Sequence, residues 1–485
     1  MENRDIFQKH KVLGIILIVL TVVSAIYGSI VLRGLYLDGA LHINCILDKM
    51  SHGQFGIYED FNHHTRFSVN FLAQLPMNIA YFFFGLKSKY WLAFLFTLPL
   101  FIFPLLSVYL NYLLSKRTGR YDITLWSLFT YCLLILPSFI FVSVELNTAA
   151  IIYFLLLNYL AGSINYEKKD AVFITLLLLF MIKSNESFIF IGYILFFASL
   201  FYARREQNSC NKKFKYIIGI GSLLVSLSFT HWVLTKPISS ESIRFWGEAV
   251  DYFQVMWNMN ALITIAGCAM LVGFFFLKKE LPTKVKFFVI ALFIAILAYL
   301  FSDLQSSLDP VYEGHFRTWP YWAVPLIFVG IAISDFFKKQ PTKTFLTNML
   351  FVVYLCGISH TIWQINNSYW FNKDFQYLKE RIKTSKSVFI VPEDNEDLFD
   401  HVFLRRYHWT FSYFNDSLLL NDDYKIKSVL LQPEDEGGLY IIDDERIMVP
   451  EDPLHIKNEF WDLTDVVNEM KKSDDFVDPK EIIYE

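Results

Sequence analysis

The sequence predicts a polytopic α-helical membrane protein with a small C-terminal α/β domain outside the membrane. Of its 485 residues, 54% are hydrophobic, and the mean hydropathy is +0.37, well above that of ordinary soluble domains. Apolar runs long enough to span a bilayer recur over the first 363 residues. After residue 364 the balance changes to 14 Lys/Arg against 27 Asp/Glu, whereas the preceding part carries 29 against 20. No grouped basic footprint is present, so nucleic acid is not expected as a partner.

About eleven apolar segments are expected to cross or enter the bilayer, which is therefore the first predicted partner. The first segment follows basic residues as a signal peptide does, but its apolar run of about 20 residues is longer than a signal core, so it is expected to remain as an anchor. The segments lie near 12–32, 90–114, 122–142, 147–164, 171–182, 187–202, 216–235, 259–277, 287–301, 319–336 and 344–363. The predicted domains are a membrane domain, 1–363, and an extracytoplasmic α/β domain, 364–485.

A further apolar run, 67–86, is expected to lie flat on the outer face. If it crossed the bilayer, every later basic loop would lie outside while the basic N-terminus stayed inside, which the positive-inside rule disfavours. A flat helix instead places the N-terminus in the cytoplasm and the acidic tail outside a plasma or inner membrane. The basic loops concerned lie at 116–120, 168–169, 204–213, 278–284 and 338–343.

Two short segments, 171–182 and 187–202, are expected to form a hairpin. Basic residues flank the pair on both sides, so the chain must go out and return. Twelve helical residues reach only about 18 Å, which is less than the hydrocarbon thickness of about 30 Å. The connecting sequence KSNES, which contains Lys183, is therefore expected to be recessed below the outer surface.

Ionisable residues collect at the outer ends of the predicted segments rather than at their middles. Asp38 follows the first segment, Glu145 follows the third, and Arg317 precedes a late one. Charged groups near the midplane are typical of ion-coupled transporters, so this distribution favours a site that opens outward. The long first outer loop, 33–89, adds further acids and bases, and loops of this length tend to be functional. The candidates among them for binding the acceptor or a metal are His42, Glu59, Asp60, His63 and His64.

This organisation resembles the GT-C fold glycosyltransferases, which use polyprenyl-phosphate-linked sugars. The resemblance is closest to the branch containing protein O-mannosyltransferases and the aminoarabinose transferase of lipid A. Asp38 in YLDGALH matches the acid of the first outer loop, and Glu145 in SVELNTA matches the second-loop acid. Lys183 matches the Lys at the turn of a short hairpin, and Arg317 in EGHFRTWPYW matches an Arg that meets the lipid phosphate. The similarity covers roughly residues 10–340, with Asp-Gly where many members have two consecutive acids.

The resemblance implies transfer of a sugar from the lipid donor to an acceptor hydroxyl of a glycan, lipid or protein, with inversion. Such transfer needs a base for the acceptor proton, and Asp38 is the candidate. Lys183 and Arg317, with Arg244 as a weaker third, would stabilise the leaving phosphate. Glu145 would orient the acceptor or hold a divalent cation, Mg²⁺ or Mn²⁺, with Asp38, and no other cofactor is predicted.

Each of these residues also has a structural interpretation. An acid after a membrane segment is often solvated, and Lys183 could cap a short helix. Arg317 could anchor at the interface beside the aromatic residues 319–322. His63 and His64 could ligate a metal, but adjacent residues rarely point the same way, so surface solvation is the favoured interpretation for this pair.

The sequence of the tail predicts short strands near 387–392, 427–433 and 438–443, and helices near 396–409 and 460–472.

Two other functions stay open. A polysaccharide polymerase or ligase would also use an outward site, but usually with several loop arginines. A transporter or flippase is disfavoured, because no repeated half and no matching pair of broken segments is present.

Overall fold

The computed structural model describes a mostly helical chain. Four of its helices are long and apolar enough to cross a membrane by length and composition: Lys11–Ile30, Lys89–Thr118, Ser209–His231 and Lys343–Thr384. The longer described ranges are 6–35, 38–47, 67–137, 146–182, 189–235, 314–338 and 341–390. The shorter ones are 263, 266–267, 270, 280, 282–286, 417–421, 424–430, 439–442, 446–448, 455–456, 460–473 and 476–477.

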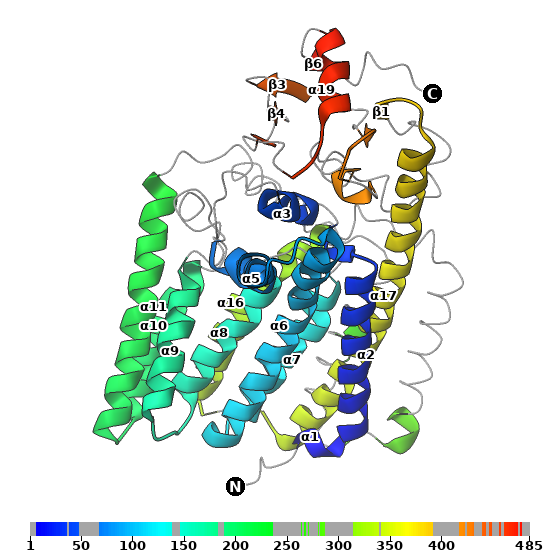
Figure 1. Cartoon of the computed structure of the whole chain (residues 1–485). Helices are drawn as coiled ribbons and strands as arrows, with labels where there is room; N and C mark the ends of the chain where they lie inside the picture. Colours follow the sequence, from blue (N-terminus) through cyan, green and yellow to red (C-terminus); the bar gives the residue numbers. More distant parts are fainter. Residues whose placement is uncertain are drawn as a thin grey trace.

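A bundle of helices forms the body of the protein, with the N-terminus and α1 (Ile6–Lys9) at one end (Figure 1). The bundle helices occupy nine of the eleven predicted segments, and the other two, 259–277 and 287–301, fall mostly outside the described residues. The bundle helices are α2 (Lys11–Ile30), α6 (Lys89–Thr118), α7 (Tyr121–Phe129) with the π-helix η2 (Thr130–Ile135), α8 (Leu146–Ala161), α9 (Lys168–Met181), α10 (Ile189–Arg205), α11 (Ser209–Thr235), α16 (Gly314–Phe336) and α17 (Lys343–Thr384).

Ion pairs join several helices at the end that carries the N-terminus, which we call the basic end. Arg117, near the end of α6, donates hydrogen bonds of 2.7 and 2.9 Å to the two carboxylate oxygens of Asp170 in the first turn of α9. Arg120 donates to the Asp335 carboxylate near the end of α16 at 2.7 Å, and Arg205 of α10 donates to the Asp335 carbonyl oxygen at 2.9 Å. The basic clusters at 116–120, 168–169 and 204–205 therefore meet at one end of the bundle.

The pKa of Asp170 shows how strongly the ion pairs at the basic end stabilise a buried carboxylate. Burial raises the pKa of this carboxyl group, but hydrogen bonds from Arg117, from the Glu167 backbone N–H and from the Tyr159 hydroxyl outweigh burial and hold the pKa below its usual range. The segment 280–286 lies at the same end, because Glu280 forms an ion pair with Lys9. The chain between α11 and α16 thus returns to the basic end.

The packing of α2 separates an apolar outer face from a face of small residues. Its exposed side chains are mostly β-branched and aliphatic, and Val12 and Ile30 are 70% and 64% exposed. On the inner face a Cβ atom at Gly28 would come within 3.0 Å of the Phe101 ring, so the backbones of α2 and α6 approach closely there. Exposed aliphatic side chains are what a lipid-facing helix carries.

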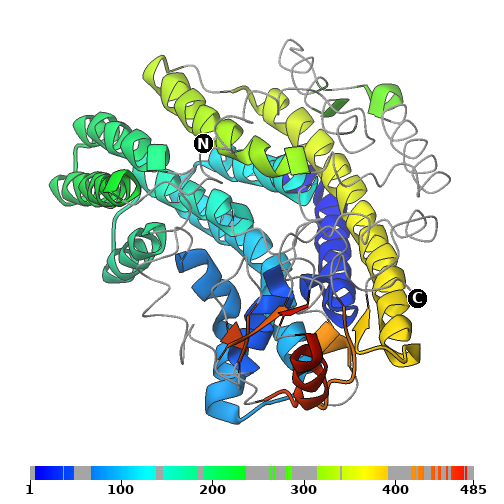
Figure 2. The same cartoon turned by 90° about the horizontal axis from the view of Figure 1, so that it is seen from above.

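Three elements lie at the opposite end, which we call the tail end: η1 (Arg33–Leu35), α3 (Asp38–Leu47) and α5 (Phe67–Phe84). Figure 1 views α5 nearly along its axis, and Figure 2, taken from above, shows its length, so α5 lies across the bundle rather than along it. The helix ends at Gly85, whose φ is +63° and whose N–H binds the Tyr81 carbonyl. This arrangement agrees with the flat helix predicted for 67–86.

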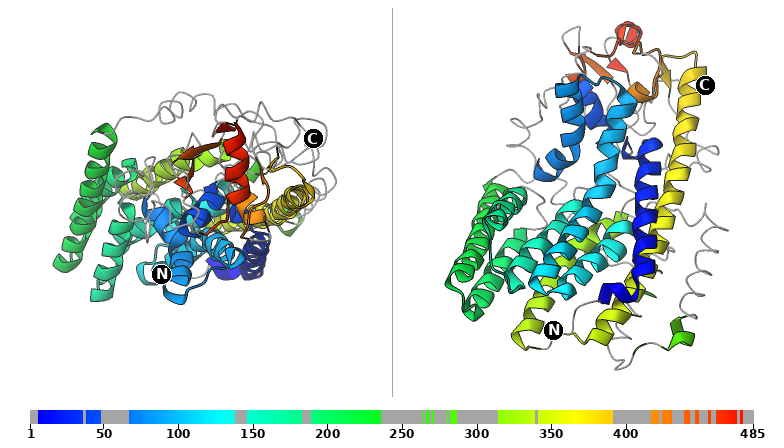
Figure 3. Two further views of the ribbon diagram at one scale, coloured as in Figure 1. Left: turned by 45° about the horizontal axis from the view of Figure 1, so that its top comes forward. Right: turned by 60° about the horizontal axis from the view of Figure 1, so that its bottom comes forward.

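The last bundle helix, α17, is longer than predicted. Its 42 residues correspond to about 63 Å, and Figure 3 shows it continuing beyond the end of α2. The apolar segment predicted for 344–363 is therefore the first part of a longer helix, and the predicted domain boundary at 364 falls inside that helix. Membrane-like hydropathy stops there, but Phe371, Phe375, Leu378 and Ile382 continue a helical spacing and are buried.

The described part of the tail holds two small sheets. β1 (Phe389–Ile390) pairs in parallel with β2 (Val429–Leu430), and the two strands lie within the runs predicted as strands near 387–392 and 427–433. The other sheet is antiparallel, with the order β5 (His455–Ile456), β4 (Arg446–Met448), β3 (Leu439–Ile442) and β6 (Phe476–Val477). Helix α19 (Thr464–Met470), followed by η8 (Lys471–Ser473), matches the helix predicted near 460–472. The helix predicted near 396–409 lies outside the described residues.

Lys89 connects this tail to the bundle. It is the first residue of α6 and only 6% exposed, and its ammonium donates a hydrogen bond to the backbone carbonyl of Asn421. The same ammonium lies 5.4 Å from the ring centroid of Trp461, which is buried beside Phe460 and Tyr424. The tail is thus held against the start of α6 as well as by its covalent link to α17.

The basic end gives a first prediction. Arg120→Met would leave the buried Asp335 and the half-buried Asp122 without their common cation, so we expect a loss of about 3 kcal/mol or more in the free energy of unfolding. Unfolding of the detergent-solubilised protein by added denaturing detergent measures this loss. The control is Arg204→Met, because Arg204 is exposed. Equal stability of the two variants would contradict the ion-pair interpretation.

A second prediction concerns pH. Burial, followed by the charges of Lys286 and Lys9, lowers the pKa of His10 to about 4, whereas an unfolded chain keeps a value of about 6.5. As the pH falls below 6.5, the unfolded state takes up a proton that the folded state refuses, so folded stability is lost progressively toward pH 4. Melting temperatures at pH 7 and pH 5 should differ more for the wild type than for His10→Gln. Equal pH dependence of the two melting temperatures would contradict this interpretation of His10.

Candidate functional site

The described structure brings two predicted site positions to the same end of the bundle. Asp38 is the first residue of α3, directly beyond η1 at the tail end. Arg317 lies in the first turn of α16, and Asp335, 18 residues later, is tied to the basic end. A helix of that length rises about 27 Å, so the α16 backbone at Arg317 lies toward the tail end. His42 lies on α3, one turn after Asp38.

The other predicted site residues lie outside the described residues. Two of them are bounded by described helices. Glu145 immediately precedes α8, and Lys183 follows α9 after one residue. Because α9 has 14 residues and α11 has 27, these helices rise about 21 and 40 Å from the same basic end. The residues outside the description are Glu145, Lys183, Arg244, Glu59, Asp60, His63 and His64.

One arginine at the tail end is more deeply buried than the sequence indicated. Arg33 has no exposed surface, and its Nη1 donates to the Gln364 carbonyl at 2.9 Å and to the Ser368 hydroxyl at 3.2 Å. A buried guanidinium needs such acceptors to offset its loss of hydration. The sequence feature that could have indicated this burial is Gly34, the next residue. A Cβ atom at Gly34 would come within 2.2 Å of the Thr97 hydroxyl oxygen. This close contact holds η1 against α6.

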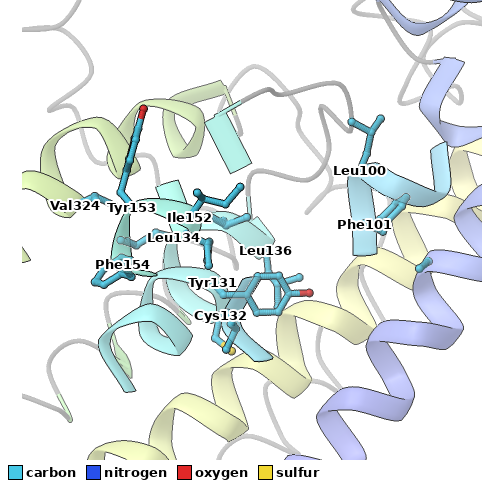
Figure 4. Close-up of a cluster of buried hydrophobic side chains, with 14 of the residues drawn as sticks. Leu100, Phe101, Tyr131, Cys132, Leu134, Leu136, Ile152, Tyr153, Phe154 and Val324 are labelled. Atoms are coloured by element: carbon cyan, nitrogen blue, oxygen red, sulfur yellow. The ribbon is translucent and has the colours of Figure 1, made fainter. Parts of the chain in front are cut away.

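The π-helix η2 lies at the centre of the bundle. Its six residues are all buried, and it packs against α17, α16 and α8. Figure 4 shows its Tyr131, Cys132 and Leu134 among side chains of α8, including Tyr153 and Phe154. A π-helix is wider than an α-helix and leaves a backbone carbonyl without its usual partner, and such segments are frequent at functional sites.

Two side chains of α17 bind carbonyl groups in and just beyond this π-helix. His360 Nδ1 lies 2.7 Å from the Cys132 carbonyl oxygen, and Gln364 Nε2 donates to the Leu136 carbonyl oxygen at 2.6 Å. A carbonyl can only accept, so Nδ1 of His360 carries the proton. The two donor residues are four positions apart, and so are the two acceptor residues. One face of α17 therefore binds one side of the widened helix at two successive turns. This pairing fixes α17 beside η2 just below the tail end.

The described residues contain no group of three or more His, Cys, Asp or Glu side chains that could hold a metal ion. The predicted divalent cation would use Asp38 and Glu145. The side chains of these two residues are not among those that the structure describes.

Comparison with family models, with curated proteins and with solved structures finds no match to this chain.

The contact between α17 and η2 gives a third prediction. Gln364→Leu keeps most of the side-chain volume but removes the donor to Leu136, leaving a buried carbonyl without that bond. We expect a loss of about 1–3 kcal/mol in the free energy of unfolding. Gln376→Leu is the matched control, because Gln376 lies on an exposed part of the same helix. If both variants unfold like the wild type, the hydrogen bond does not stabilise η2.

Proposed function

We propose that the protein is a membrane glycosyltransferase that moves a sugar from a polyprenyl phosphate to an acceptor hydroxyl on the outer face of the membrane. The observation that supports this proposal is the common location of two helix starts. Helix α3, beginning with Asp38, and the first turn of α16, carrying Arg317, both lie at the tail end. An acid and a cation there are the two charges that the reaction requires.

In the proposed topology, eleven segments enter the bilayer, the basic end faces the cytoplasm, and the acidic tail is extracytoplasmic. The gathering of basic loops at one end is the charge distribution expected of a cytoplasmic surface. The flat helix α5 then lies at the outer interface, where Phe83 and Phe84, 71% and 80% exposed, can enter the lipid headgroup region.

In the proposed reaction, Asp38 takes the proton of the acceptor hydroxyl as its oxygen attacks the anomeric carbon of the donor sugar. The bond between that carbon and the phosphate oxygen breaks on the opposite face, which inverts the configuration. Arg317 and Lys183, with Arg244, neutralise the charge on the departing polyprenyl phosphate. Glu145 orients the acceptor or shares a divalent cation with Asp38.

The fourth prediction tests this function. Purified protein incubated with radiolabelled polyprenyl-phosphate sugars and membrane acceptors should transfer label, and Asp38→Asn should lower the rate at least about 100-fold. The control is Glu380→Gln, because Glu380 is an exposed residue of α17. Equal rates for Asp38→Asn and the wild type would remove Asp38 as the base, and no transfer from any lipid-linked sugar would remove the function.

A further inference from the structure

Three segments of the chain bring lysine side chains together at the basic end. Helix α1 packs against α17, whose first residue is Lys343. Lys9, the last residue of α1, forms an ion pair with Glu280. The turn that follows Glu280 is closed by a hydrogen bond of 3.1 Å from the Lys286 N–H to the Pro282 carbonyl. We call Lys9, Lys286 and Lys343 the lysine cluster.

The pKa values of Lys9 and His10 show that the charges of the cluster act on one another. Burial, followed by the charges of Lys286 and Lys343, lowers the pKa of Lys9. Burial, followed by the charges of Lys286 and Lys9, lowers the pKa of the neighbouring His10 to about 4. A lowered pKa of a basic group means that its protonated form is destabilised by the surroundings. The ion pair with Glu280 therefore leaves a positive potential at the cluster.

Other cations at the basic end meet carboxylate groups more completely. Arg117 pairs with Asp170, and Lys215 pairs with Glu206 at 3.1 Å. Within the described part of the chain, the lysine cluster forms one such pair, through Glu280, so three positive charges meet one negative charge. Diffuse counterions are enough for a lone surface lysine, whereas gathered like charges repel one another and attract an anion. The charge balance of the cluster thus favours an anionic ligand.

The exposed face of α2 indicates which anion fits. Val12, Ile15 and Val19 are 70%, 49% and 54% exposed and follow a helical spacing, so an apolar surface begins in the first turn of α2, just after Lys9. A free phosphate ion would gain nothing from that surface. A phospholipid would use both parts, because its acyl chains can pack along an apolar helix while its phosphate stays level with the flanking lysines.

The start of α17 adds positive partial charge at the same place. The Thr342 hydroxyl accepts a hydrogen bond of 3.2 Å from the Phe345 N–H, and the Leu346 N–H binds the Thr342 carbonyl. The N–H groups that precede Phe345 have no partner within the helix. Together with the helix dipole, they favour negative charge beside Lys343.

We propose that the lysine cluster binds the phosphate of an anionic phospholipid whose acyl chains lie along the exposed face of α2. The ammonium groups of Lys286 and Lys343 donate to the phosphate oxygens, and Lys9 is shared between the lipid and Glu280. The cluster lies at the end of the bundle opposite to the proposed reaction site. Lipid binding there is therefore independent of the proposed transferase, and either can fail without the other.

The test measures melting temperatures of the full chain in detergent micelles. Added phosphatidylglycerol should raise the melting temperature more than phosphatidylcholine with the same acyl chains. In the double variant Lys286→Gln, Lys343→Gln, the amount of phosphatidylglycerol that gives half of the shift should rise about tenfold or more. Without lipid, this variant should melt at the wild-type temperature or above, because like charges have been removed. The matched control is Lys212→Gln, Lys213→Gln, which removes the same charge from the start of α11 at the basic end.

Further arms distinguish the lipid from a free anion and from a general charge effect. Lys286→Arg, Lys343→Arg keeps both charges and should keep the wild-type response. Equal weakening in the two Gln double variants overturns the cluster, and so does a wild type that responds equally to the two phospholipids or to neither. Inorganic phosphate or glycerol phosphate that reproduces the shift of phosphatidylglycerol overturns the lipid as occupant. If the first double variant does not fold, Lys343→Gln alone is titrated, and an unchanged half-point overturns the proposal.

Discussion

The arrangement of the bundle depends on one constraint, the satisfaction of backbone polar groups in an apolar interior. A wide π-helix in the middle of the bundle leaves carbonyl groups that water cannot reach, and each would cost free energy if it stayed unpaired. His360 and Gln364 meet this need from α17. In the most apolar 18-residue stretch of α17, 89% of the residues are buried, so neighbours surround this part of the helix on nearly every side. The position of α17 then sets where η1 can dock, because Arg33 binds the Gln364 carbonyl.

Buried charged groups hold helices together at both ends of the bundle. At the basic end, charges are neutralised in pairs, as in Arg120 with Asp335 and Arg117 with Asp170. At the tail end, the contacts of Arg33 include the Gln364 carbonyl and the Ser368 hydroxyl. Ion pairs therefore fix several helix ends at the basic end, and the buried guanidinium fixes η1 on α17 at the tail end.

The sequence predicted the features that depend on composition alone. The helix positions followed from apolar runs, and the orientation of α5 followed from the requirement that basic loops share one side. The full length of α17 was missed because its second half leaves the apolar range and keeps only a helical spacing of Phe371, Phe375 and Leu378. The π-helix was missed because its wider turns leave no recognisable signal in the continuous apolar run 122–142. Arg33 was considered only as a loop residue, since burial of a guanidinium depends on acceptors more than 300 positions away.

The tail is held at two points, which restricts its orientation over the tail end of the bundle. α17 leads into β1 without a break in the described chain, and Lys89 holds Asn421 and Trp461 at the start of α6. A domain joined by one linker could turn freely, whereas contacts at both α17 and α6 restrict it to one orientation over the bundle. Since α3 packs against α6 beneath these contacts, the tail stays close to Asp38. In the proposed enzyme an acceptor would therefore reach the site between α3 and a tail of fixed orientation, so acceptor size would be limited by the fold itself.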